Sequence, residues 1–129
     1  MKALLVRLVR FASVGSMGTV LQLAVLAGLT GVAGLHFLPA TAVAVETAIL
    51  HNFIWHECWT WGDRAREGER LRRLVRFHGT TGLLSIFGNL LFMALFVGEL
   101  SFPPLAGNVA SIACCAGFNF LLNHRVVFV

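Results

Sequence analysis

The stretch that decides the fold is residues 11–45, FASVGSMGTVLQLAVLAGLTGVAGLHFLPATAVAV, which contains no Asp, Glu, Lys or Arg. It is too long for one membrane span, because about 20 apolar residues cross the hydrocarbon core as a helix. The segment 34–39, GLHFLP, interrupts the stretch with a glycine and a proline, and proline cannot continue a helix interior. The sequence therefore predicts one helix over residues 11–33 and a second over residues 40–61.

The composition supports a membrane protein. The chain has 129 residues, of which 57% are apolar and 12% are charged. A sphere of this size cannot hide that much apolar surface from water, so a water-soluble globule and a disordered chain are both excluded. Nucleic acid is not expected as a partner, because the arginines lie in short flanks beside apolar segments.

The second half of the chain repeats the pattern of the first. Residues 62–73, GDRAREGERLRR, are polar and belong outside the hydrocarbon. Two further apolar runs predict helices over residues 76–98 and 105–125, separated by residues 99–104, ELSFPP. The predicted fold class is therefore an all-α polytopic membrane protein, with four transmembrane helices in a single domain over residues 1–129.

The basic residues predict the orientation. All 10 Lys and Arg residues lie in the N-terminal flank, in the 62–76 segment or near the C-terminus. With four spans these three segments fall on one side, and the positive-inside rule places that side in the cytoplasm. We therefore expect a multi-pass protein of the cytoplasmic (inner) membrane, with both termini in the cytoplasm.

An internal repeat is indicated by two matches. The segment RLVRF occurs at residues 7–11 and again at 73–77, and NFIWH at 52–56 is echoed by NFLLN at 119–123, with offsets of 66 and 67 residues. These offsets predict two copies of a helix pair, over 7–61 and 73–128. Because each copy crosses twice, the copies are parallel, and substrate sites of such proteins often lie where the repeats meet. The alternative is a duplication that only doubled a packing unit.

Polar side chains form a stripe on the last predicted helix. Its members are Asn108, Ser111, Cys115, Asn119 and Asn123. Steps of three and four residues place them on one helical face, which points at protein or water rather than at lipid. Three more polar residues lie in other spans and complete a predicted polar pathway for a sugar: Asn52, His56 and Asn89. The alternative is that these side chains only hydrogen-bond between helices.

Glu46 is an acidic residue flanked by apolar residues within the second predicted helix. A carboxylate there must be protonated, paired or in a wet cavity, which suggests a functional group of the same pathway. His51 lies on another face of that helix, so we expect any partner of Glu46 on another helix.

No enzyme, metal or cofactor site is predicted. His56-Glu57 resembles the start of HExxH, but Thr60 stands where the second histidine would be. We expect no catalytic residue, metal or cofactor. The 3 cysteines form no CxxC pair and are expected to pack as small apolar residues.

Five arginines at the basic ends of the helices are candidates for binding a lipid headgroup: Arg7, Arg10, Arg73, Arg76 and Arg125. Two Arg at i, i+3 share one side of a helix, and a guanidinium grips phosphate oxygens with two hydrogen bonds. The positive ends of the helix dipoles add to the field. The alternative is that these arginines only set the topology and attract anionic lipid headgroups.

Two further features concern packing. Trp55, Trp59 and Trp61 lie near the basic end of the second helix, where an interfacial aromatic belt is expected. Small residues of the first helix recur at i, i+4, as in Ala24 and Gly28, and such faces let helices approach closely. We therefore expect a homodimer.

Taken together, these residues resemble the GtrA-like family of small four-helix membrane proteins. The resemblance rests on Arg10-Phe11 leading to Val14-Gly15, on Asn52-Phe53 followed by WTWGD at 59–63, and on NFLLNHRVVF at 119–128. The chain departs from the family pattern at His56-Glu57, where members usually carry Asn and a basic residue.

The resemblance implies a role in cell-surface polysaccharide synthesis. It points to a non-enzymatic, flippase-like translocator of a polyprenyl-phosphate-linked sugar, with such a lipid and a membrane glycosyltransferase as partners. The alternative is a membrane scaffold that recruits a glycosyltransferase. A small multidrug exporter driven by protons is a third reading, opposed by the absence of a carboxylate in the first helix.

Overall fold

The computed structural model describes residues 1–128, apart from the side chains of residues 117 and 118. Its elements are helices and turns. The helices are α1 (Lys2–Ala27), α2 (Phe37–Trp55), α3 (Arg70–Phe77), α4 (Leu83–Met93) and α5 (Pro104–Leu122). Wider π-helical turns extend α1, α2, α4 and α5 and join α3 to α4. They span Gly28–Val32, His56–Thr60, His78–Gly82, Ala94–Glu99 and Asn123–Val127.

Three continuous helical segments are long and apolar enough to cross a membrane: Lys2–Val32, Phe37–Thr60 and Arg70–Glu99. The fourth predicted span consists of two pieces, Pro104–Ala116 and Asn119–Val127, which meet at an angle of 44°. The all-α, polytopic fold predicted from the hydropathy pattern is therefore confirmed.

The first and third spans begin earlier than the sequence suggested, at Lys2 rather than residue 11 and at Arg70 rather than residue 76. Hydropathy marks only the part of a helix that lies in hydrocarbon. The backbone hydrogen bonds continue beyond it, because the flanks of both helices are rich in Leu and Arg, which favour helix. The basic residues of these flanks therefore lie on helical turns and not in loops.

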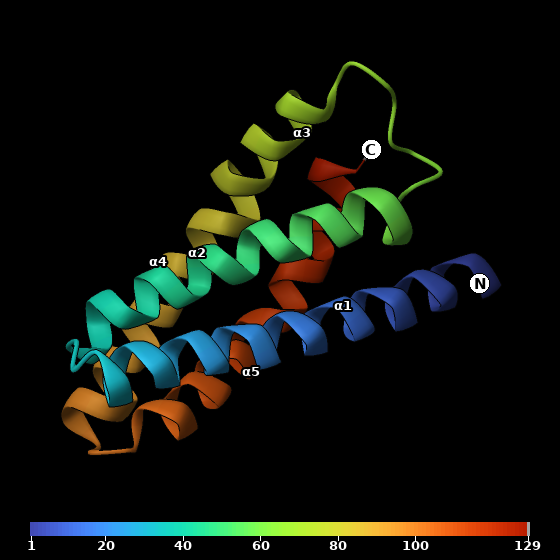
Figure 1. Cartoon of the computed structure of the whole chain (residues 1–129). Helices are drawn as coiled ribbons and strands as arrows, with labels where there is room; N and C mark the ends of the chain where they lie inside the picture. Colours follow the sequence, from blue (N-terminus) through green and yellow to red (C-terminus); the bar gives the residue numbers. More distant parts are fainter. Residues whose placement is uncertain (129) are drawn as a thin grey trace.

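The helices form one bundle with alternating directions (Figure 1). α1 and the α3–α4 helix run away from the end that holds both termini and the 61–69 connection, whereas α2 and α5 run back toward it. We call that end the basic end. The other end holds the connections at residues 33–36 and 100–103.

The two halves of the chain end in turns with matching backbone hydrogen bonds. At the basic end Trp61 N–H donates to His56 O at 2.9 Å, and 67 residues later Phe128 N–H donates to Asn123 O at 3.0 Å. The turns at the other end match as well, since Gly34 and Ser101, at the same offset, both have a positive φ of 68° and 59°. The offset between these matched pairs equals one of the two offsets found in the sequence.

Apolar side chains pack in two clusters. The larger one, toward the basic end, is built around Trp61, Phe77 and Phe128 with residues of α2, and the smaller one, toward the other end, joins Leu26 and Met93 with alanines of α2. Trp61 is fully buried, whereas Trp55 and Trp59 are exposed. The interfacial position expected for all three tryptophans is therefore wrong for Trp61.

Candidate functional site

A cavity of about 520 Å³ lies within the bundle, between α1, α2, α4 and α5. Its polar lining comes from both halves of the chain: Ser16, Thr19, Gln22, Asn52, His56, Ser85, Asn89, Asn119 and Asn123. Asn52, His56, Asn89, Asn119 and Asn123 belong to the predicted polar pathway, so the fold brings them around one space. The described residues that line this cavity include no Asp, Glu, Lys or Arg.

The cavity is closed on one side and open on the other. The lining residues of α2 and α4 are largely buried, as Val45 and Asn89 illustrate. On α1 and α5 the lining residues Ala12, Ser16 and Ala116 are exposed. The opening therefore lies between α1 and α5, on the outer surface of the bundle, which faces lipid when the helices span a membrane.

The polar stripe of α5 and of the turn that follows it faces inward. Asn108, Ser111, Cys115 and Asn123 are buried and Asn119 is half-buried. Asn108 lies outside the cavity lining and accepts a hydrogen bond of 2.6 Å from Gln22 Nε2, which joins α1 to α5. The stripe thus serves helix association at Asn108 and lines the cavity at Asn119 and Asn123.

Three amide oxygens at the cavity have no hydrogen-bond partner in the described part of the chain: Oδ1 of Asn89, Asn119 and Asn123. Their orientation is fixed from the other side, because Asn89 Nδ2 donates to Ser85 O at 2.7 Å and Asn123 Nδ2 donates to Asn119 O at 2.7 Å. A carbonyl can only accept, so each amide presents its oxygen elsewhere. A buried acceptor without a donor is costly, and hydroxyl groups or water would satisfy these three.

Asn52 and His56 lie on the α2 side of the cavity. Asn52 packs against Gly18 so closely that a Cβ at Gly18 would lie 2.2 Å from Asn52 Oδ1, so the glycine permits this contact between α1 and α2. His56 is buried, stacks on Phe11 with 5.0 Å between ring centroids, and its Nδ1 lies 3.0 Å from Thr60 Oγ1. It therefore forms part of the cavity wall nearest the basic end.

Glu46 lies outside this cavity. Its Oε1 is 2.8 Å from Nε2 of His78, and the two side chains are 43% and 32% exposed. Of the three possibilities left open for Glu46, the structure shows pairing: its partner is His78, so the contact connects α2 to the turn His78–Gly82. The structure does not bring Glu46 together with the amide groups.

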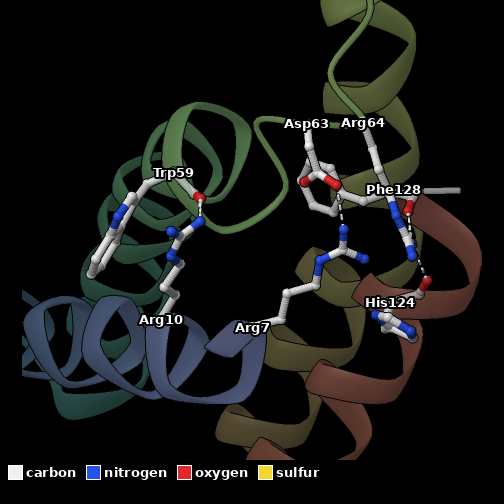
Figure 2. A network of polar contacts seen from close by, with 7 residues as sticks. All are labelled: Arg7, Arg10, Trp59, Asp63, Arg64, His124 and Phe128. Carbon is white, nitrogen blue, oxygen red and sulfur yellow. Dashed lines mark hydrogen bonds and ion pairs between the residues drawn. The ribbon is translucent and has the colours of Figure 1, made fainter. Parts of the chain in front are cut away.

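The five candidate arginines do not form one group. Arg7 pairs with Asp63, and Arg10 donates to Trp59 O at 2.9 Å (Figure 2). Arg73 is buried against Glu57, with Nε–Oε2 and Nη2–Oε1 distances of 2.9 and 2.6 Å. Arg76 and Arg125 are exposed at the surface. Arg10 and Arg73 thus stabilise the end of α2, Arg10 through the helix C-terminus and Arg73 through Glu57.

Several residues of the site were not among the candidates named from the sequence. Gln22 and Ser85 line the cavity, and Ser85 Oγ accepts from Asn119 Nδ2 at 2.9 Å. Arg64 reaches from the 61–69 connection to the end of α5, where it donates to Phe128 O at 2.7 Å. Gln22 could have been found as the amide inside the uncharged stretch 11–45, whereas Arg64 depends on a contact that periodicity does not encode.

Comparison with known proteins identifies the family of this chain. Residues 10–128 match the family model described as the GtrA/DPMS transmembrane domain. The chain belongs to this family. The GtrA-like resemblance seen in the sequence is therefore confirmed, and with it a multi-pass membrane protein.

A curated relative of this GtrA-like chain is a dolichol-phosphate mannosyltransferase of Pyrococcus furiosus. The two are 30% identical over 94 residues, which cover 69% of this chain and 24% of the relative. The chain thus spans about a quarter of the length of the curated relative that it matches.

Proposed function

We propose that this GtrA-like protein binds a polyprenyl-phosphate-linked sugar and moves its headgroup across the cytoplasmic membrane for cell-surface polysaccharide synthesis. The observation that carries the proposal is the cavity with the unpartnered amide oxygens of Asn89, Asn119 and Asn123. Sugar hydroxyls are donors that such oxygens accept, and the uncharged lining suits a neutral polar group.

The side opening fits a lipid-linked ligand. A polyprenyl chain can remain in the bilayer while its headgroup enters between α1 and α5, where Ala12, Ser16 and Ala116 leave space.

We further propose that the basic end faces the cytoplasm and that residues 7–61 and 73–128 are parallel repeats, supported by the matching hydrogen bonds of the two halves. The protein then contributes binding and movement and no bond-breaking step.

The test is transport of a labelled polyprenyl-phosphate sugar in liposomes. Asn89→Leu combined with Asn123→Leu removes two unpartnered oxygens and keeps the branched four-atom shape of each side chain, so the fold should persist. If each oxygen accepts one hydroxyl bond worth about 1 kcal/mol, losing both should lower transport about thirtyfold. The transport rate is measured as the rate at which the labelled sugar becomes oxidised by an impermeant oxidant in the external buffer.

Glu46→Gln is the matched control, because it changes a polar residue of the membrane segment that lies outside the cavity. It should keep transport within about twofold of the wild-type rate. Equal transport by a folded Asn89→Leu, Asn123→Leu protein contradicts the proposal, and so does a rate no higher than that of protein-free liposomes. Proton-driven efflux of a cationic dye that is lost in Glu46→Gln would instead favour the exporter.

A scaffold that recruits a glycosyltransferase is the second candidate. It is supported by the match to one quarter of an enzyme whose name states a mannosyltransferase activity. In this case the exposed residues Arg66 and Glu67 of the 61–69 connection should matter more than the cavity. Loss of enzyme co-purification on their replacement by alanine, with the Asn89→Leu, Asn123→Leu protein unaffected, would favour the scaffold.

A further inference from the structure

Basic side chains from three segments converge at the basic end of the bundle. Arg7 comes from α1, Arg64 from the 61–69 connection, and His124 and Arg125 from the turn Asn123–Val127 that follows α5. Figure 2 shows the guanidinium groups of Arg7 and Arg64 and the ring of His124 in one region of the basic end. Arg125 follows His124 directly in that turn.

This cluster continues the walls of the cavity. Arg7 lies one helical turn before Phe11, and His124 lies one turn after Phe120, on which its ring stacks at 5.9 Å. Phe11 and Phe120 both line the cavity, and their rings meet edge to face at 5.0 Å. The basic cluster is therefore at the rim of the cavity, at the place where α1 begins and α5 ends.

The cluster has hydrogen-bond donors to spare. Arg64 uses Nη1 for the carbonyl oxygens of Phe128 and His124, at 2.7 and 3.4 Å, so its Nε and Nη2 groups keep their hydrogens for another acceptor. In the described residues, the buried Nδ1 of His124 has no partner. The carboxylate in contact is that of Asp63, which pairs with Arg7 and is 62% exposed. Three guanidinium groups against one carboxylate leave a net positive site.

We propose that Arg7, Arg64, His124 and Arg125 bind the phosphate group of a phosphate ester at this rim. Guanidinium groups bind phosphate oxygens through paired hydrogen bonds, and an imidazole N–H of His124 can donate to the same oxygens. The placement rests on the proposed function, because a lipid bound here has its phosphate beside the cavity that would take its sugar. The binding itself requires no transport.

The test is binding of radiolabelled polyprenyl monophosphate to the full-length protein in nanodiscs of zwitterionic lipid. The wild type should retain this lipid at least tenfold better than the uncharged polyprenol. His124→Gln should weaken retention about fivefold. Arg7→Gln combined with Asp63→Asn, which removes one guanidinium at constant net charge, should do the same. Inorganic phosphate as competitor separates the two sources of phosphate: displacement identifies the free anion as a ligand, and resistance identifies the lipid.

The matched control is Arg66→Gln combined with Arg72→Gln, which removes two exposed cations of the same end outside the cluster. It should retain the lipid within about twofold of wild type. Equal retention of polyprenol and its phosphate overturns the proposal. So does wild-type retention by either cluster variant, or an equal loss in the control. Failed transport with intact, cluster-dependent binding would reject the translocator and leave the phosphate site standing.

Discussion

Replacing Arg73 by leucine should lower the free energy of unfolding by about 3–5 kcal/mol, because it leaves a buried carboxylate without its main partner. The side chains of Arg73 and Glu57 are 8% and 5% exposed, and the guanidinium holds both carboxylate oxygens. The remaining partner of Glu57 is Arg70, whose Nε lies 3.3 Å from Oε1 and whose side chain is 74% exposed. An exposed partner at that distance cannot replace the lost pair.

The cysteines offer a way to measure this loss. Cys115 is buried, whereas Cys58 and Cys114 are exposed, so replacing both exposed cysteines by serine leaves one protected thiol. Its labelling by a maleimide in micelles of rising SDS content reports unfolding. Arg70→Leu is the matched control and should cost at most about 1 kcal/mol, as exposed pairs do. Adding Glu57→Gln to Arg73→Leu should recover part of the loss, since no buried charge then remains.

An equal effect of Arg70→Leu and Arg73→Leu would contradict this account. It would mean that the pair is not buried in the folded protein, and that Arg73 is free for a headgroup, as the duplicated RLVRF segment suggested. Transport and lipid binding measured on the same variants would then show whether Arg73 has that role.

The helices and the inward polar stripe were accessible from sequence because the bilayer constrains both. Every backbone group in hydrocarbon needs a partner, so long apolar runs become helices. A stripe of amides must face away from lipid, which is how Asn119 and Asn123 come to line the cavity. Helical periodicity identified Asn119 and Asn123, and Asn52, His56 and Asn89 were found as polar residues within apolar spans, without any knowledge of the packing.

Partners across the bundle were not accessible in this way. The pattern Arg-x-x-Arg-Phe shows that Arg73 and Arg76 share a helical side, and it does not show that Glu57 lies opposite one of them. The same limit applies to Glu46, whose partner His78 could not be named from the sequence. Which side chains pair depends on the tilt of α3 against α2, and that tilt is set by packing rather than by periodicity.

The packing of Trp61 could not be predicted from periodicity either. Its replacement by alanine should lower the free energy of unfolding by about 3–5 kcal/mol, as for other buried aromatic residues. Its indole stacks on Phe128 with 4.6 Å between ring centroids and 3° between planes, and it meets the His56 ring edge-on at 5.1 Å. The two stacked rings occupy equivalent positions of the two halves, 67 residues apart. Deleting one ring removes a large apolar contact between the halves at the basic end.

Trp61→Phe and Trp59→Ala are the informative controls for Trp61→Ala in the same thiol-labelling assay. Trp61 Nε1 has no hydrogen-bond partner in the described part of the chain, so phenylalanine keeps the stacking and loses no bond, and should cost at most about 1.5 kcal/mol. Trp59 is 40% exposed, and its removal should cost less than Trp61→Ala. If Trp59→Ala proves as destabilising as Trp61→Ala, both tryptophans act as interfacial anchors and the stacked pair does not hold the two halves together.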